Sequence, residues 1–294
     1  MTLIVTAATL NFVAQVSDRR LTQPSSGELF SDDANKAVLL QCKDGTLSFA
    51  YSGLGFVGQR RTDDWITDVL GDLGAADMRG GEVIDSLTEA ATDQFTKLSP
   101  RPVDARLTVA VCGWPAARGL RRSFVGFISN FEELEPFVGT GFQRSHCYGK
   151  ARATFSSQVS FPNPRIKNAS FIQTTGRDEA VAHFNKRQRK LRDFILRNPG
   201  PEAVTRKLVA FIRRCADHPE EGKYIGRDCM AVFISDDGCT SAYYPEDSSR
   251  PVSFAPHLVA PGFAVKDIYI SNRHLTREEM ERWKHQGKRG APDV

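Results

Sequence analysis

The sequence has no hydrophobic run of about 18 residues, the length that a membrane-spanning helix needs. No basic region follows Met1, and threonines interrupt the first apolar run, so we expect no secretory signal peptide. Internal repeats and low-complexity tracts are also missing. These absences argue against membrane, secreted and fibrous proteins, and we expect a globular protein of the cytoplasm.

Closely spaced cysteine pairs are missing as well. No CxxC spacing occurs, so the sequence indicates neither a zinc site nor a disulfide framework, and we expect no metal and no cofactor. The six cysteines are Cys42, Cys112, Cys147, Cys215, Cys229 and Cys239.

Strong charge is missing too. A net charge of +4 over 294 residues is too small to imply nucleic acid by itself. One basic run, residues 186–192, lies on an expected helix with an apolar opposite face. A solvated helix face therefore explains this run better than a site for nucleic acid or phosphate.

What the sequence does contain is strand patterns in blocks, separated by pairs of helices. Runs rich in β-branched and apolar residues predict strands at 3–7, 12–16, 37–40, 46–51, 107–112, 123–128, 171–176, 229–234 and 242–244. Apolar residues on one helical face predict helices around 65–70, 83–95, 178–195 and 204–212. A short last helix is expected from Thr276, where Glu279 completes a capping box.

This order predicts one α+β domain over residues 1–294. Two antiparallel sheets stacked face to face, with helix pairs outside, would bury all the apolar faces in a four-layer αββα sandwich. Residues 130–170 mix aromatics, prolines and glycines without a period, and we expect an irregular insertion or a short extra hairpin there. Residues after about 245 are expected to form a C-terminal extension.

The first two residues carry the strongest chemical signal. Initiator methionine is normally removed before a side chain as small as threonine, so we expect the mature chain to begin at Thr2. The free α-amino group has a pKa near ~8 and can help to take the proton from the threonine hydroxyl. A threonine inside a chain has no such built-in base.

Five short motifs occur in one order after this threonine: Asp18-Arg19-Arg20-Leu21-Thr22, Asn35-Lys36-Ala37-Val38, Ser52-Gly53, Thr175-Gly176 and Ile225-Gly226-Arg227-Asp228. Together they resemble the proteasome β-subunit family of N-terminal-nucleophile (Ntn) hydrolases. Residues 139–141 are a rival match for the fourth motif, without a long helix directly after them. The serine and aspartate that support the threonine near the last motif of the family are missing, and Tyr224-Ile225 stands where a serine is expected.

The resemblance implies catalytic roles for Thr2, Asp18, Lys36 and Thr175. Thr2 would attack a carbonyl carbon and form an acyl-enzyme, with Lys36 beside its hydroxyl and Asp18 orienting Lys36. Thr175 would assist, although a helix cap is the more common role for such a threonine.

The resemblance also implies how a substrate would be held. The backbone N–H of Gly53 would face the oxyanion, and Thr22 and Arg20 would bind the substrate, a peptide or another amide. A homo-oligomer is expected, without membrane or nucleic-acid partners.

Two other functions remain open at this stage. The chain could be a catalytically inactive Ntn-fold subunit with a structural or interaction role, or a module that binds polyanions through its basic helix. Retention of Met1 would favour the inactive subunit, and salt-sensitive binding to polyanions would favour the module.

Overall fold

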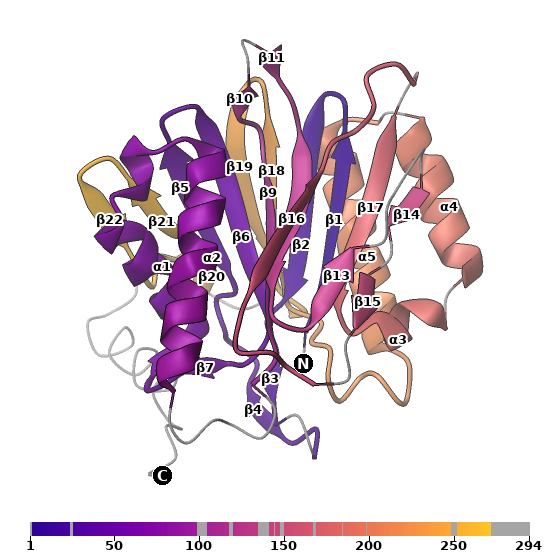
Figure 1. Ribbon diagram of the computed structural model, residues 1–294. Coiled ribbons are helices and arrows are strands. Elements are labelled where there is room, and N and C mark those ends of the chain that lie inside the picture. Colours follow the sequence, from indigo (N-terminus) through magenta and orange to yellow (C-terminus); the bar gives the residue numbers. More distant parts are fainter. Residues whose placement is uncertain are drawn as a thin grey trace.

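The computed structural model describes residues 2–23, 26–98, 105–117, 120–134, 141–143, 145–147, 150–166, 169–183, 185–197, 199–247 and 252–271. Within this part of the chain, a mixed α/β structure is built on two larger sheets (Figure 1). The helix expected from Thr276 lies outside the described residues. No helix in the described part is both long and apolar enough to cross a membrane.

The first sheet has six strands in the order β14-β17-β1-β2-β18-β19. Their bounds are β1 Leu3–Thr9, β2 Phe12–Asp18, β14 Gly141–Gln143, β17 Ser170–Gly176, β18 Cys229–Ser235 and β19 Gly238–Tyr244. Strands β1 and β2 are buried along their whole length. They form the centre of the sheet, where both faces are covered, and this explains their nearly continuous apolar sequence.

The second sheet has seven strands in the order β16-β12-β9-β6-β5-β21-β22. Their bounds are β5 Ala37–Cys42, β6 Gly45–Gly53, β9 Leu107–Gly113, β12 Phe124–Ser129, β16 Ser156–Ser160, β21 His257–Ala260 and β22 Phe263–Val265. Two-stranded pairs surround the sheets: β3 Leu21–Thr22 with β4 Leu29–Ser31, β7 Phe56–Val57 with β8 Arg60–Arg61, β10 Ala116–Ala117 with β11 Leu120–Arg121, β13 Glu132–Leu134 with β15 Ser145–Cys147, and β20 Val252–Phe254 with β23 Tyr269–Ser271.

The expectation of two purely antiparallel sheets is wrong at the edges. Strand β14 runs parallel to β17, and β21 runs parallel to β5. Apolar alternation shows which face of a strand is buried but not the direction of its neighbour, so the sequence pattern could not reveal these parallel pairs. Parts of both unassigned segments, 130–170 and the residues after 245, thus extend the sheets.

Helices cover the outer face of each sheet (Figure 1). Their bounds are α1 Thr62–Asp72, the 3₁₀ turn η1 Ala75–Asp77, α2 Gly80–Lys97, α3 Asp178–Ala182, α4 Asn185–Leu196 and α5 Pro201–Ala216. The predicted helix 178–195 is in fact two helices. The Gln188 side chain donates a hydrogen bond to the carbonyl of Val181 at 2.6 Å, which satisfies a carbonyl near the end of α3.

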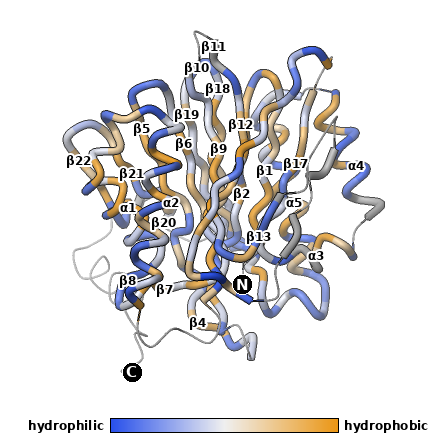
Figure 2. The backbone as a smooth tube through the Cα atoms, viewed as in Figure 1, coloured by the Kyte–Doolittle hydropathy of each residue, from blue (hydrophilic) through white to orange (hydrophobic). Residues whose placement is uncertain are grey.

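Buried side chains fill three layers of core. One cluster lies under α1 and α2, and a second lies under α3, α4 and α5. A third joins the two sheets, with Ala8 and Met230 from one sheet and Cys112 and Val125 from the other. Figure 2 shows hydrophobic residues along the central strands and on the inner sides of the helices. The two sheets therefore pack face to face, with helices outside both.

Candidate functional site

The polar site lies where β1 and β5 begin and where β2 and β6 end. Antiparallel pairing puts the start of one strand beside the end of its partner, as the register Ile4↔Ser17 and Ala37↔Ala50 shows. Thr2 just before β1, Asp18 at the end of β2 and Lys36 just before β5 are therefore brought to one place. All three are buried, with Asp18 and Lys36 at 0% exposure and Thr2 at 2%.

Lys36 connects the other two residues. Its Nζ donates hydrogen bonds to Thr2 Oγ1, to Asp18 Oδ1 at 3.3 Å and to the carbonyl of Arg20. Burial lowers the pKa of Lys36 below the ordinary lysine value, and the charge and hydrogen bond of Asp18 offset this only in part. A lysine of this kind loses its proton more easily than an exposed one, and it already contacts a hydroxyl.

Asp18 holds the backbone around the threonine. Oδ2 accepts the N–H of Leu3 at 2.7 Å, the residue directly after Thr2. Oδ1 accepts the N–H groups of Arg20 at 2.8 Å and Gly226 at 3.2 Å. Three backbone donors and one lysine thus surround this buried carboxylate, and their hydrogen bonds replace those that it would make to water.

Two further groups, apart from those around Asp18, hold the carbonyl of Thr2. It accepts the Arg177 N–H at 3.0 Å and the Ser52 hydroxyl at 3.3 Å. Arg177 is itself held by Glu221, at 2.7 Å from Nε to Oε2, and its guanidinium lies over the Tyr224 ring at 4.3 Å. Sequence reasoning missed Arg177 and Glu221, because nothing in their 44-residue separation indicates that they meet.

Two glycines at the site have backbone conformations that side chains rarely adopt. Gly176 has φ +97°, and a Cβ there would lie 2.0 Å from the Thr2 carbonyl oxygen. Gly53 has φ +103° at the end of β6, and a Cβ there would lie 2.1 Å from the Arg106 carbonyl oxygen. Both positions require glycine because the neighbouring backbone leaves no space for a methyl group.

The structure does not join Thr175 to the polar site. Thr175 pairs with Ile4 in the sheet and is buried, but no hydrogen bond among the described residues connects it with Thr2, Asp18 or Lys36. Its neighbour Gly176 is the residue that packs against Thr2. Of the rival match at 139–141, residues 139 and 140 lie outside the described residues.

The two predicted substrate-binding residues lie next to the site. Arg20 contributes its carbonyl to Lys36, while its guanidinium pairs with Asp32 at 2.6 Å. Thr22 is half-buried in the short strand β3, opposite Leu29. The side chain of Arg20 therefore already has a carboxylate partner.

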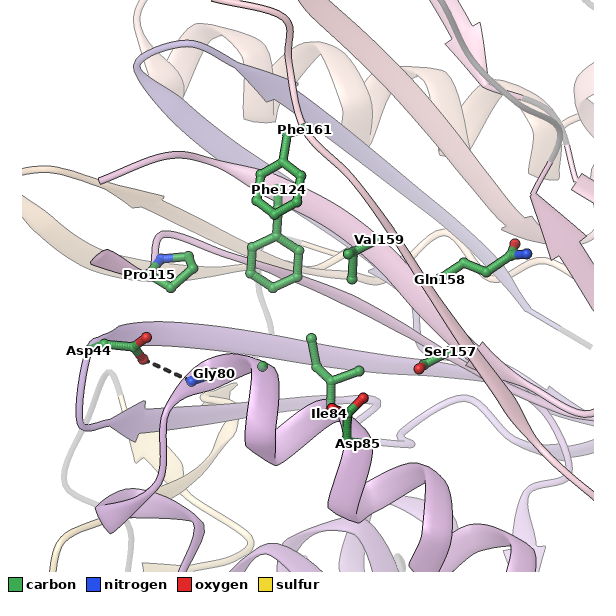
Figure 3. A pocket seen from close by; sticks show the side chains of 11 residues that line it. Asp44, Gly80, Ile84, Asp85, Pro115, Phe124, Ser157, Gln158, Val159 and Phe161 are labelled. Carbon is green, nitrogen blue, oxygen red and sulfur yellow. Dashed lines mark hydrogen bonds between the residues drawn. The ribbon is translucent and has the colours of Figure 1, made fainter. Parts of the chain in front are cut away.

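A separate cavity of about 340 Å³ lies at the far end of β6, beside the start of α2 (Figure 3). Apolar side chains such as Ile84, Phe124 and Phe161 line it, together with Asp44 and Asp85. Asp44 accepts the N–H of Gly80 at 2.8 Å. The length of β6 separates the cavity from Thr2 by roughly 25 Å, so it is not part of the polar site.

Comparisons with known proteins give a likeness of fold but not of sequence. No family model matches the sequence, and no curated protein matches it. Among solved structures, the fold is similar to Anbu (ancestral beta-subunit) from Yersinia bercovieri, with 13% sequence identity and a TM-score of 0.49. The match covers 84% of this chain and 88% of that chain. We therefore base the proposed chemistry on the contacts around Thr2.

Proposed function

We propose that the chain is an N-terminal threonine hydrolase of the proteasome-like type, with the four-layer αββα fold of Ntn hydrolases. After removal of Met1, Thr2 would cleave peptide or other amide bonds through an acyl-enzyme. The observation that carries this proposal is the hydrogen bond between Lys36 Nζ and Thr2 Oγ1 inside a fully buried pair with Asp18.

Each residue then has a chemical role. Lys36 and the freed α-amino group share the task of taking the proton from Oγ1 as it attacks the carbonyl carbon. Asp18 keeps Lys36 oriented and fixes the backbone of Leu3. A donor such as the Gly53 N–H would stabilise the oxyanion, and loss of one such donor typically lowers the rate by about 10²- to 10³-fold. Thr175 has no part in this scheme.

The first test is whether Thr2 becomes the amino terminus. Intact-mass measurement on protein from its own type of cell should show loss of Met1, and a threonine-directed electrophile should add once to the wild type. Lys36→Ala should lower the labelling rate by about 10² to 10⁴. Retained methionine, a blocked amino group or equal labelling of both proteins would contradict the proposal.

The substrate class needs a second test. Short fluorogenic peptides should be cleaved, and a peptide aldehyde or boronate should inhibit, because both resemble the tetrahedral intermediate. Inhibition without peptide cleavage would point to small amides as substrates.

One observation favours the alternative of a catalytically inactive subunit. Thr2 is only 2% exposed in the chain that still carries Met1, whereas a nucleophile must reach its substrate, so removal of Met1 would have to open the site. If Met1 is removed and neither labelling nor inhibition occurs, the inactive subunit is the better description. In both cases we propose a homo-oligomer in the cytoplasm.

A further inference from the structure

A second polar cluster is buried where the C-terminal segment crosses the first turn of α1. We call Asp63, Asp64, His257 and Asp267 the His257 cluster. His257 opens β21 and Asp63 lies in α1, and both are fully buried. The side chain of Asp64 is 25% exposed and that of Asp267 is 49% exposed, so solvent reaches one side of the cluster.

The Thr67 hydroxyl limits the tautomers of His257. It lies 2.8 Å from the backbone carbonyl of Asp63 and 3.1 Å from His257 Nδ1, and it can donate its single hydrogen to only one of them. When it donates to the carbonyl, Nδ1 carries a hydrogen and Nε2 of the neutral ring has a free lone pair. This is the tautomer that can bind a metal ion through Nε2.

That lone pair lies in an unusual environment. Nε2 is buried and has no hydrogen-bond partner among the described residues. It faces Asp63 Oδ2 at 3.6 Å and Asp267 Oδ1 at 3.9 Å. Both distances are too long for hydrogen bonds. The same two oxygens also face Arg61, which pairs with Asp63 Oδ2 and is the positive group already present beside them. Asp64 Oδ1, which lies 3.9 Å from His257 Nδ1, is also buried and has no hydrogen-bond partner in the part of the chain that the structure describes.

The charges around the cluster do not balance. Arg61 pairs with Asp63 and lies 3.6 Å from Asp267, so one guanidinium faces three carboxylates. The neighbouring Lys266 pairs with Asp68, outside the cluster. Asp267 also has φ +50°, a conformation that is uncommon for residues other than glycine. The cluster is thus held together although its charges favour separation.

We propose that the His257 cluster is a site for a divalent first-row transition-metal ion, Zn²⁺ or Mn²⁺, that joins the C-terminal segment to α1. Ligand atoms of Asp63, Asp64 and His257 lie within 4.8 Å of one another. Ligands on a tetrahedral zinc ion lie about 3.4 Å apart, so the ligand atoms would have to move together by up to about 1.4 Å when the ion binds. Imidazole nitrogen with carboxylate oxygens suits these ions, and the Nδ1–H bond to Thr67 is the outer contact that metal-binding histidines usually make.

The test uses the full-length protein after treatment with a chelator. Calorimetric titration with Zn²⁺ and with Mn²⁺ should show one equivalent bound by at least one of them, and that ion should raise the unfolding temperature. His257→Gln should abolish binding. Asp267→Asn should weaken it at least about 10-fold. Because Asp267 is half-exposed, we expect Asp267→Asn to fold. This variant therefore tests metal binding if His257→Gln does not fold.

A surface group provides the matched control. His183, His218 and Glu220 also have ligand atoms within 4.8 Å of one another. His183→Gln should leave binding unchanged. The proposal is overturned if neither ion binds, if binding is lost in His183→Gln but kept in Asp267→Asn, or if nitrogen NMR of metal-free protein at neutral pH shows an imidazolium at His257 with no response to metal.

Discussion

At the scale of single residues, the buried pair of Asp18 and Lys36 determines the character of the site. Neither side chain is exposed, whereas the nearby pair of Arg20 and Asp32 is 22% and 35% exposed. Water screens the second pair and not the first. A charge left without its partner is therefore much more costly at the first pair.

Asp18→Asn should lower the free energy of unfolding by about 3 kcal/mol or more, because it leaves Lys36 uncompensated and offers fewer acceptors to three backbone N–H groups. Asp32→Asn should change it by less than about 1 kcal/mol. Urea denaturation of the two variants measures both values. Equal destabilisation would show that the Asp18 network does not behave as a buried charged site.

The lowered pKa of Lys36 gives a prediction about pH. In acid Lys36 is protonated and cannot accept the hydroxyl proton of Thr2, so the labelling rate should rise with pH, with a midpoint below the ordinary lysine value of 10.5. In Lys36→Arg the cation is permanent, so the part of the rise that comes from Lys36 should disappear and only the titration of the α-amino group, near ~8, should remain. The amino group of Thr2 is present in both proteins. Identical pH profiles would exclude Lys36 as the proton acceptor.

At the scale of elements, the C-terminal end of β17 packs against Thr2, which we propose to be the first residue of the mature chain. Gly176→Ala would place a methyl group against the Thr2 carbonyl and the Ser52 side chain. We expect a loss of about 3 kcal/mol in unfolding free energy, together with slower labelling. Gly262→Ala is the matched control, since Gly262 has φ +82° but no atom within 4 Å of the added Cβ. Its loss should be near 1 kcal/mol, and a similar loss for both would show that only backbone strain matters.

Elements whose patterns are local could be predicted from the sequence. Strands β1 and β2 are mostly apolar, and α2 has a regular apolar face, so these elements were expected in their places. The segment 178–195 is divided into two helices, and a side-chain hydrogen bond from Gln188 to Val181 accompanies the break, but apolar periodicity does not show such a break.

The resemblance of the motifs led us to expect Thr2, Asp18 and Lys36 together, and the structure brings them together. For Thr2 and Asp18 the physical reason is local, because β1 begins directly after Thr2 and pairs with β2, which ends at Asp18. The contacts of Arg177 with Glu221 and of His257 with Asp63 join segments that are distant in sequence. These contacts form only when whole sheets pack together, and no local sequence pattern indicates them.

At the scale of the whole molecule, β22 forms one edge of the seven-stranded sheet with its side chains exposed, including Phe263 at 52% and Val265 at 40%. Exposed apolar edge strands favour pairing with another chain. We expect light scattering at micromolar concentration to show an oligomer and Phe263→Glu with Val265→Lys to reduce its size. The corresponding change Val159→Lys is on β16, the strand at the other edge of the sheet. It tests whether that edge, and not β22, pairs with another chain. A wild-type monomer would contradict the homo-oligomer.

The partners of Asp18 also determine when the threonine can become reactive. They come from residues 3, 20, 36 and 226, so the carboxylate has its full set of bonds only after most of the chain has been synthesised and folded. A nascent or truncated chain that ends before β18 would carry Thr2 without this environment. If Thr2 is the nucleophile that we propose, its reactivity would depend on completion of the fold, and unfinished chains would lack the environment needed to attack amide bonds.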